Sequence, residues 1–206
     1  DVLTYDINRL LSNTETLPEL VNNSDIIFVC VPTPMKKDGS CDTSIVEGVV
    51  NDINETVNVG QDGKTVVIKS TIPPGTTERL NGEYPFINII FNPEFLTEAN
   101  YLEDFKNQNR VILGGKRPGT TKVKQVYSKV LPNTKVIKTG ATHAEMVKYF
   151  TNTFLATKVS FANEMYEICV KLGIDYDKGV EYSTYDERLV KSHWAFPGPD
   201  SHCGCC

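Results

Sequence analysis

The longest hydrophobic pattern in the chain runs from Ala144 to Leu172, a segment without Gly or Pro. Its apolar residues recur at spacings of three and four, which is typical of one face of an α-helix. At 1.5 Å per residue such a helix spans roughly 40 Å, which is longer than an ordinary helix of a globular domain. Thr142 or His143 can begin it, and Gly173 can end it. The pattern predicts one long helix in the second half of the chain.

Two polar side chains interrupt the apolar turns near the start of this helix. Lys148 and Asn152 are four residues apart, so both leave the same face of the helix, one above the other. Such a pair is most often a solvated helix edge. They become candidates for a functional site only because of what the rest of the chain supplies.

Before the long helix, short apolar runs alternate with helical patterns. The runs lack polar alternation, as expected of strands that are buried on both faces of a parallel sheet. The expected strands are Val2–Tyr5, a run opened by Asp25, Thr65–Lys69, Ile87–Phe91, Arg110–Leu113 and Lys135–Ile137. The expected helices are Thr16–Asn23, one that begins with the capping-box pattern Ser44-x-x-Glu47, one from Thr76, and Thr121–Val130. This order predicts an α/β fold with a doubly wound, parallel, Rossmann-like sheet and right-handed crossovers.

Proline follows three of these strands, and a polar residue stands at each of the three strand ends. The residues are Thr33 within Pro-Thr-Pro, Thr71 ahead of Pro-Pro-Gly, and Glu94 after Asn-Pro. Proline removes a backbone donor and stops the strand. Since open α/β sheets bind ligands at the carboxyl ends of their strands, we expect these side chains at one ligand-binding edge.

Composition narrows the class of protein. The 206 residues carry a net charge of -5, which argues against binding to nucleic acid through phosphate neutralisation. No apolar run reaches the length of a membrane span, and no signal peptide is recognisable, so we expect no membrane partner. Three scattered cysteines read as free thiols of a cytoplasmic protein. The crowded Cys203, Cys205 and Cys206 do not follow a familiar zinc pattern, so we expect no metal site.

Several motifs, in register along nearly the whole chain, carry a family resemblance. They are VCVPTP, KSTIPPGT, NPEFLTEA, the AEMVKYFTNTFLA helix, DERL and PGPD. Together they resemble the nucleotide-sugar 6-dehydrogenases, the family that includes UDP-glucose 6-dehydrogenase. Related β-hydroxyacid and 6-phosphogluconate dehydrogenases share the plan of a Rossmann domain and a long helix, but they lack this combination of motifs.

The resemblance implies an activity, a cofactor and partners. It implies oxidation of the C6 alcohol of a nucleotide sugar, UDP-glucose above all, to a carboxylate. The reaction would use two NAD⁺ and a cysteine that forms a thiohemiacetal and then a thioester. It also implies a homodimer formed through the long helix.

The resemblance also implies a domain organisation. Residues 1–139 would be the NAD-binding domain without its first strand and Gly-rich loop, and residues 140–206 would be the long helix and the start of the middle domain. The C-terminal UDP-binding domain would be absent, so we expect a fragment that is inactive alone.

The same resemblance implies roles for cofactor-binding residues. Asp6 would bind the adenosine ribose, although an Asp after a strand is also a common turn residue. Thr33 and Thr71 would line the nicotinamide side, and Thr71 would also orient the catalytic water. Glu98 would contact the cofactor.

A second set of residues would face the sugar nucleotide. Glu94 would be the acid/base for thioester hydrolysis, and Lys148 with Asn152 would face the C6 oxygen, where they are suited to stabilise an oxyanion. Further substrate contacts are implied for Phe95, Leu96, Thr97 and, toward the partner subunit's substrate, Arg188. The plainer alternatives are acidic residues in a first helical turn for Glu94 and Glu98, and a surface arginine for Arg188.

The chain departs from the family at its end. The family's nucleophile follows a PG loop in a G-F-G-G-x-C segment, whereas this chain reads PGPDSHCGCC from Pro197. Aligned without a gap, the nucleophile would lie just past Cys206. Aligned from the cysteine backward, Cys206 is the nucleophile and the loop is three residues shorter.

Two other functions stay open at this point. The chain could be a non-catalytic Rossmann and dimerisation module, or part of a two-electron β-hydroxyacid-type dehydrogenase, which needs no cysteine. A G-x-G-x-x-G segment ahead of Asp1 and a G-x-C-F-P-K-D segment beyond Cys206 would decide against these two alternatives.

Overall fold

The computed structural model describes residues 2–57, 63–190 and 192–194, with the side chain of Glu98 left aside. The chain forms two compact units. The first holds residues 1–95 and 102–148, and the second holds residues 96–101 and the chain from Tyr149 onward. The boundary between the units falls inside the long helix, between Lys148 and Tyr149.

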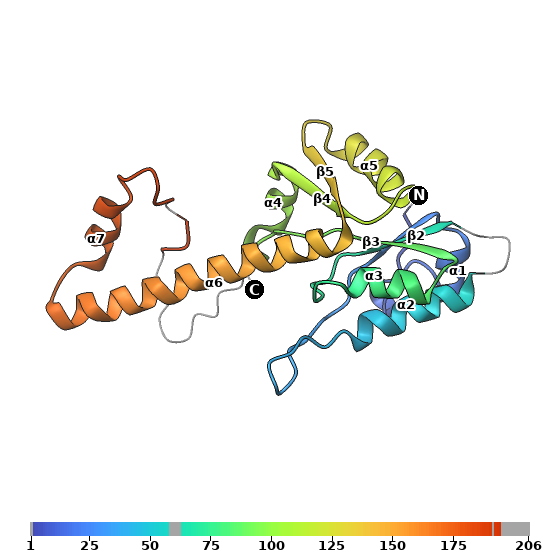
Figure 1. Ribbon diagram of the computed structural model, residues 1–206, viewed down its shortest axis with the longest axis horizontal. Helices are drawn as coiled ribbons and strands as arrows, with labels where there is room; N and C mark the ends of the chain where they lie inside the picture. The colour runs from blue at the N-terminus through green and yellow to red at the C-terminus, as the bar shows by residue number, and fades with distance from the viewer. Residues whose placement is uncertain (1, 58–62, 191, 195–206) are drawn as a thin grey trace. The chain divides into compact units, whose positions relative to one another are not determined.

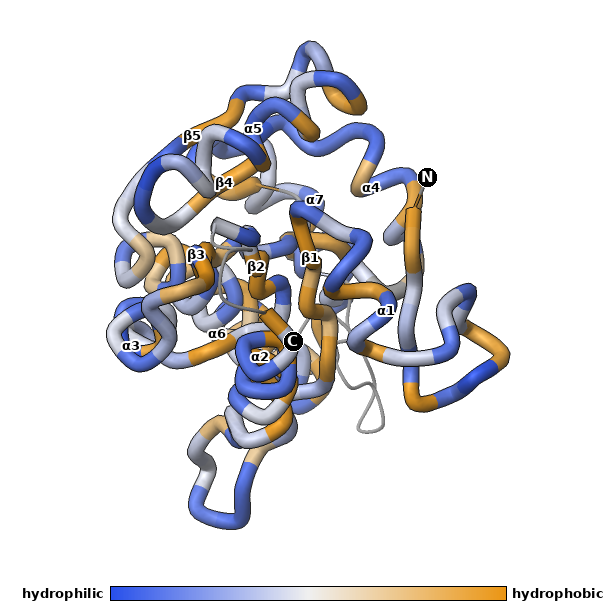
Figure 2. The backbone as a smooth tube through the Cα atoms, turned by 90° about the vertical axis from the view of Figure 1, so that its right-hand side faces the viewer, coloured by the Kyte–Doolittle hydropathy of each residue, from blue (hydrophilic) through white to orange (hydrophobic). Residues whose placement is uncertain are grey.

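Five strands form one sheet in the first unit, and they lie side by side in chain order (Figure 1). They are β1 (Ile26–Val29), β2 (Lys64–Ile68), β3 (Ile87–Phe91), β4 (Arg110–Gly114) and β5 (Lys135–Thr139). β1, β2 and β3 pair in parallel, and so do β4 and β5. Figure 2 shows β1, β2 and β3 as mostly hydrophobic segments of the tube, as the buried core of such a sheet requires.

Nine helical segments accompany the strands within the described residues. In the first half they are η1 (Arg9–Leu11), α1 (Leu17–Asn22), α2 (Ser44–Thr56) and α3 (Thr76–Glu83). Later come η2 (Glu98–Asn100), α4 (Tyr101–Asn107), α5 (Gly119–Val130), α6 (Ala141–Leu172) and α7 (Tyr176–Ser183). Among the residues that the structure describes, no helix is long and apolar enough to cross a membrane.

Hydrophobic side chains from the sheet alternate between two helix-covered faces. One face packs against α1, α2 and α3, which contribute residues such as Val50, Ile53 and Leu80, all fully buried. The other face packs against α5 through Val123 and Tyr127. Each fully buried aliphatic side chain contributes about 1.5–3 kcal/mol to folding. Helices on both faces confirm the predicted doubly wound, Rossmann-like α/β class, and α6 confirms the predicted long helix.

The junction between β3 and β4 differs from the expected parallel pairing. The two strands meet in antiparallel direction at a single register pair, Phe91 with Gly114. After β3 the chain turns through η2 and α4 and comes back toward the end of β3. Parallel pairing would have required a connection that returns the chain to the opposite end of the sheet before β4 begins.

The predicted strand at Val2–Tyr5 is wrong, because the structure has no strand there. The Thr4 carbonyl accepts the backbone N–H groups of Asn13 (3.1 Å) and Thr14 (3.2 Å), and the Thr4 N–H donates to the Asn13 side chain (2.7 Å). These backbone groups are therefore satisfied by a loop. Asp6, expected directly after a strand, follows an irregular segment instead.

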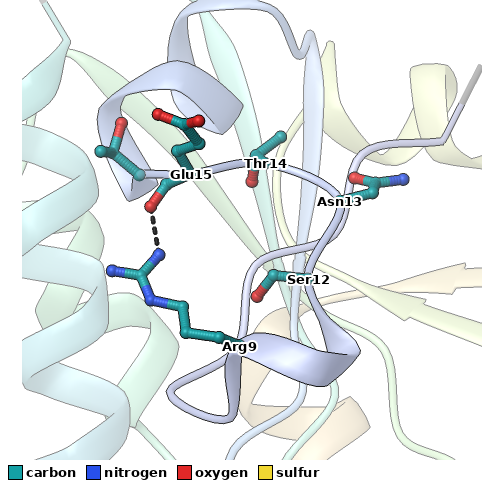
Figure 3. A pocket seen from close by; sticks show the side chains of 6 residues that line it. Arg9, Ser12, Asn13, Thr14 and Glu15 are labelled. Carbon is teal, nitrogen blue, oxygen red and sulfur yellow. Dashed lines mark hydrogen bonds between the residues drawn. The ribbon is translucent and has the colours of Figure 1, made fainter.

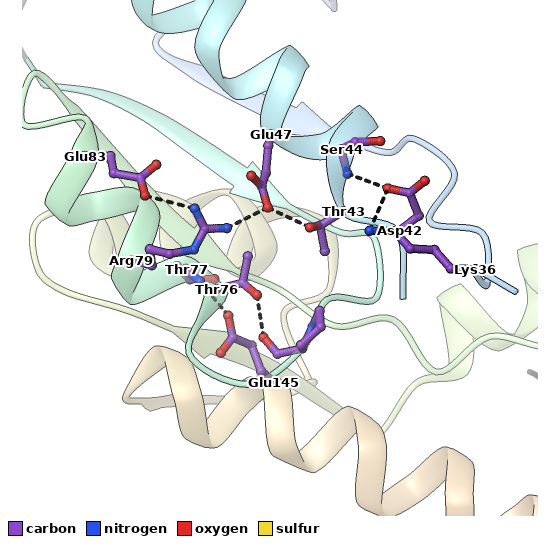
Figure 4. A network of polar contacts seen from close by, with 11 residues as sticks. Lys36, Asp42, Thr43, Ser44, Glu47, Thr76, Thr77, Arg79, Glu83 and Glu145 are labelled. Atoms are coloured by element: carbon purple, nitrogen blue, oxygen red, sulfur yellow. Dashed lines mark hydrogen bonds and ion pairs between the residues drawn. The ribbon is translucent and has the colours of Figure 1, made fainter. Parts of the chain in front are cut away.

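The predicted capping box at the start of α2 is also wrong. Thr43, not Ser44, is the N-cap residue, and its hydroxyl donates to the Glu47 carboxylate at 2.6 Å. The same Glu47 oxygen accepts from Arg79 of α3 at 2.6 Å (Figure 4). Glu47 thus ties α2 to α3, and it does not cap its own helix.

β1 departs from the expected burial on both faces. Phe28 in its middle is 42% exposed, whereas its neighbours Ile27 and Val29 are buried. β1 is the edge strand of the sheet. On the face of Phe28, the fully buried cluster built around α5 reaches only as far as Val67 of β2.

In the second unit, α7 and the described residues that follow it, as far as Trp194, pack along α6. The Tyr166 and Tyr176 rings meet edge to face at 5.5 Å between centroids. The Lys158 ammonium donates to the carbonyls of Val190 (3.2 Å) and Ser192 (2.7 Å) and lies 5.5 Å from the centre of the Trp194 ring. These contacts hold the segment after α7 against the second unit's part of α6.

Candidate active site

The carboxyl ends of β1, β2 and β3 lie at one edge of the first unit's sheet, because these strands are parallel neighbours. The connections beyond them are tied together: the Val31 N–H donates to the Ser70 hydroxyl (3.0 Å), which donates back to the Val31 carbonyl (2.6 Å). Thr33 and Thr71 follow on this edge and are half-buried. The sheet therefore places both threonines at the edge that the sequence analysis expected.

Asn92, at the end of β3, is held by three side-chain hydrogen bonds. It is 1% exposed and its amide donates to the Ile112 carbonyl at 2.8 Å. Its side-chain oxygen accepts from the Tyr127 hydroxyl (2.5 Å) and the Lys69 ammonium (3.3 Å). These bonds fix the start of the loop that carries Glu94 two residues later.

Glu94 and Lys148 meet within the first unit. The Lys148 ammonium donates to the Glu94 carbonyl at 2.6 Å and to its carboxylate Oε1 at 2.9 Å. The lysine side chain is 6% exposed, and the glutamate side chain is 35% exposed. A buried ammonium requires hydrogen-bonded partners of this kind. The geometry brings together two residues that the sequence analysis predicted for one site.

Phe95 lies between two cations beside this ion pair. The centre of its ring is 5.5 Å from the Lys148 ammonium and 4.7 Å from the Arg110 guanidinium. Cations are attracted to the face of an aromatic ring at such distances. The ring therefore helps to hold the Lys148 side chain.

Burial and neighbouring charges shift the pKa values of two side chains near this edge, Lys69 and Tyr127. Burial lowers the pKa of Lys69, while the nearby Cys30 and Glu94 oppose that change and Lys148 adds to it. Burial, with a smaller contribution from Cys30, raises the pKa of Tyr127 to about 12. Lys69 and the Glu94–Lys148 pair thus influence one another electrostatically.

The remaining predicted substrate residues belong to the second unit. They are Leu96, Thr97, Asn152 and Arg188. Asn152 is half-buried and lies one turn beyond Lys148 along α6. Arg188 is an exposed residue, and its guanidinium pairs with the Asp186 carboxylate at 2.5 Å. The roles of all four residues stay predictions.

Some predicted positions lie outside the described residues. These are Cys206, the loop from Pro197 to Asp200, and the side chain of Glu98. The two alignments of the nucleophile proposed from the sequence therefore both stand as predictions.

Asp6 lies in the irregular N-terminal segment, half-buried, with one carboxylate oxygen accepting the Asn8 N–H at 2.7 Å. The same segment encloses an open hollow of about 590 Å³, into which Arg9 reaches to donate to the Glu15 carbonyl (Figure 3). Neither Glu94 nor Lys148 lines this hollow. The bonding of Asp6 leaves acceptor capacity for a diol, because a carboxylate accepts about four hydrogen bonds.

Sequence reasoning missed several residues that hold the site together. Asn92 and Tyr127 are 35 positions apart, and Lys69 reaches the same amide from the residue just after β2. Glu145, a fully buried carboxylate on α6, was missed as well. Its one signal in the sequence is the spacing of three residues between Glu145 and Lys148, which puts both side chains on neighbouring positions of the predicted helix.

Two family models match the chain. The NAD binding domain of the UDP-glucose/GDP-mannose dehydrogenase family matches residues 2–131, and the central domain of the same family matches residues 142–206. The chain belongs to the UDP-glucose/GDP-mannose dehydrogenase family. It contains the family's NAD-binding domain, so NAD is its cofactor.

Named relatives agree with this family. The chain is 34% identical to the UDP-glucose 6-dehydrogenase TuaD of Bacillus subtilis over 191 residues, which are 89% of this chain and 40% of that protein. A solved UDP-glucose dehydrogenase from Pyrobaculum islandicum matches 89% of the chain and 44% of its own length, with 33% identity and a TM-score of 0.82. A GDP-mannose dehydrogenase from Pseudomonas aeruginosa matches 90% of the chain and 44% of its own length, with 29% identity and a TM-score of 0.78. The chain thus spans less than half the length of these family members.

The residues at this edge of the sheet fit a dinucleotide such as NAD. Thr33 and Thr71 present hydroxyls at the carboxyl edge of parallel strands, where dinucleotides bind in such folds. Within the described residues these hydroxyls are not engaged by another side chain or carbonyl. They are therefore available to a ligand.

Proposed function

We propose that the complete protein oxidises the C6 alcohol of a nucleotide sugar to a carboxylate, as in the conversion of UDP-glucose to UDP-glucuronate. The names of the relatives and the family membership support this class of substrate. The observation that carries the proposal is the buried Lys148 ammonium against the Glu94 carboxylate at 2.9 Å. This pair combines an oxyanion-stabilising cation with a proton acceptor at one place.

The chemistry assigns a task to each group. When the alcohol is oxidised, negative charge develops on the C6 oxygen. The Lys148 ammonium and, one helical turn later, the Asn152 amide are donors suited to that charge. The Glu94 carboxylate accepts the proton of the attacking water when the acid is released, and Thr71 orients that water. NAD⁺, when bound, would supply the hydride acceptor for the two oxidations.

The cofactor would be held by this chain in two places. Asp6 would accept hydrogen bonds from the adenosine ribose. Thr33 and Thr71 would contact the nicotinamide side, and Glu98 would contact the cofactor as well.

The sugar nucleotide and the second subunit would meet further residues. Phe95, Leu96 and Thr97 follow Glu94 directly and would touch the sugar nucleotide. Arg188 would reach the substrate of the partner subunit in a homodimer formed through α6. The second unit's part of α6 exposes aromatic side chains suited to such an interface, including Phe150 (69%) and Phe154 (65%).

The covalent steps require a cysteine thiolate. The thiolate adds to the C6 aldehyde and forms a thiohemiacetal, loss of a second hydride gives a thioester, and water releases the carboxylate and the thiolate. Overall, one alcohol, two NAD⁺ and one water give one carboxylate, two NADH and three protons. Cys206, or a cysteine just beyond it, would be this nucleophile.

The number of NADH molecules formed for each substrate molecule consumed tests the proposal. The complete protein is incubated with limiting UDP-glucose and excess NAD⁺, and NADH is measured by absorbance. We expect two NADH per UDP-glucose consumed. One NADH per substrate would favour the two-electron dehydrogenase, and no NADH with any nucleotide sugar would favour the non-catalytic module.

A further inference from the structure

Glu145 is a buried carboxylate to which the proposed reaction gives no task. It is fully buried on α6. Its Oε2 accepts the Gly75 N–H at 2.6 Å and its Oε1 accepts the Thr77 N–H at 2.8 Å. Figure 4 shows the side chain rising from α6 toward the start of α3. Charge-assisted bonds to these amides offset the cost of burying the carboxylate at the helix N-terminus.

Lys148 follows Glu145 by three residues, so the two side chains leave neighbouring positions on α6. Glu145 holds the end of the loop after β2, which contains Thr71. Lys148 holds the loop after β3, through its bonds to Glu94. Two adjacent turns of one helix therefore hold two of the strand ends that form the candidate site.

The start of α6 has no room to slide on the sheet. A Cβ atom added at Gly114 of β4 would lie 2.4 Å from the Ala144 Cβ and 3.0 Å from the Ala141 Cα. This is backbone-close packing, which resists displacement. On the other side, Gly75 is fixed in a left-handed turn with φ of +96°. The Glu145 carboxylate thus bridges two rigid elements.

We propose that Glu145 is a positioning residue that sets the place of Thr71 relative to Lys148. It does so by tying the Thr71–Gly75 loop to the helical turn that carries the lysine. This inference rests on the proposed function, in which Thr71 and Lys148 face the reacting groups. Glu145 itself touches neither substrate nor cofactor.

The test is Glu145→Gln in the complete protein. The amide keeps one acceptor oxygen, but its NH₂ group would face the second backbone N–H, so one bond is lost and the loop shifts. Misplacement by about 1 Å can cost a reaction about 100-fold. We expect kcat per folded protein to fall about 10- to 100-fold. The matched control is Glu78→Gln, the same change at an exposed position in the first turn of α3.

Hydrogen–deuterium exchange locates the effect of the variant. In Glu145→Gln we expect faster exchange in segment 71–77, which loses a bond to α6, and unchanged exchange in segment 92–95, which Lys148 still holds. Faster exchange in 71–77 with unchanged kcat per folded protein would mean a merely local cap and would overturn the inference, as would unchanged exchange in 71–77.

A second variant covers the case in which Glu145→Gln does not fold. Glu145→Asp keeps the charge but shortens the side chain by one methylene, so it cannot make both bonds without moving the helix. We expect segment 71–77 to exchange faster and kcat per folded protein to fall at least about 3-fold; normal exchange and normal kcat would contradict the inference. If the unmutated protein produced no NADH, the proposed function would fail, and the exchange result would still decide the role of Glu145.

Discussion

The Lys148 ammonium and the Glu94 carboxylate lie 2.9 Å apart, but they differ in exposure. The lysine side chain is almost completely enclosed, at 6%, while the glutamate side chain is 35% exposed. In the reaction that we propose, the enclosed cation would lie close to the reacting oxygen and out of competition with water. The partly open carboxylate would be accessible to the attacking water. The unequal exposure fits the proposed division between oxyanion stabilisation by Lys148 and proton transfer by Glu94.

Lys148→Ala should lower kcat about 100- to 1,000-fold, because removing a donor to a developing oxyanion has an effect of this size. NAD binding should change by less than about 3-fold, since we propose that the lysine faces the C6 oxygen of the sugar and not the cofactor. Steady-state kinetics and NAD titration measure the two effects. Lys171→Ala, at an exposed position in the last turn of the same helix, is the control. An unchanged kcat would remove Lys148 from the site.

Glu94→Gln should affect the last chemical step most. The amide cannot take the proton of the attacking water, so steady-state turnover should fall about 100-fold or more. The first oxidations should still occur, and rapid mixing should therefore show a burst of NADH before the slow phase. Glu103→Gln is the control, since Glu103 forms an exposed surface pair with Lys106. Loss of the burst together with turnover would show that Glu94 acts earlier.

The sequence was sufficient for those features that depend on local periodicity. The spacing of apolar residues predicted α6, and uninterrupted apolar runs predicted all five strands of the sheet. It also predicted that Lys148 would belong with Glu94, although that expectation needed the family resemblance as well as the helical spacing.

Other features depend on which of several possible partners a residue contacts in the folded chain. The spacing of apolar residues along the sequence carries no information about that choice. The Ser44 capping box failed because Thr43 and Arg79 both compete for the Glu47 carboxylate. The direction of β4 depends on how the chain turns through η2 and α4. The three bonds to Asn92 join segments that are distant in sequence.

Tyr127→Phe should destabilise the fold by about 1–2 kcal/mol, because the buried Asn92 oxygen loses its 2.5 Å donor. Chemical denaturation at pH 8 measures the loss. Tyr185→Phe is the control, because among the described residues the Tyr185 hydroxyl bonds only to Glu181, at an exposed position. If the free energy of unfolding changed by less than about 0.3 kcal/mol, the Tyr127 hydrogen bond would make no net contribution to stability.

The same variant gives a prediction for the pH dependence of stability. Burial raises the pKa of Tyr127 to about 12 in the folded protein, against about 10 in an unfolded chain. Between these values the unfolded state loses the proton first, so the wild-type protein loses stability as the pH rises. At pH 11 the loss from this group is about 1.4 kcal/mol. The advantage of wild type over Tyr127→Phe should therefore shrink between pH 8 and pH 11. A constant difference would contradict the raised pKa.

Two glycines should respond in opposite ways to replacement by alanine. Gly114→Ala would place its Cβ 2.4 Å from the Ala144 Cβ, so β4 or the start of α6 must move. Overpacking of this kind costs about 1–3 kcal/mol. Gly48, exposed in the middle of α2, has no atom within 4 Å of an added Cβ. Alanine there should stabilise the fold by about 0.5–1 kcal/mol, because it favours the helix over the unfolded chain.

Activity adds a second measurement for the same pair. Since the displaced part of α6 carries both Glu145 and Lys148, Gly114→Ala should lower kcat per folded protein as well as the melting temperature. Gly48→Ala should raise the melting temperature and leave kcat unchanged. If Gly114→Ala kept full activity, the close packing of α6 on β4 would matter for stability alone. The position of Glu145 and Lys148 in the site would then not depend on how closely α6 packs on β4.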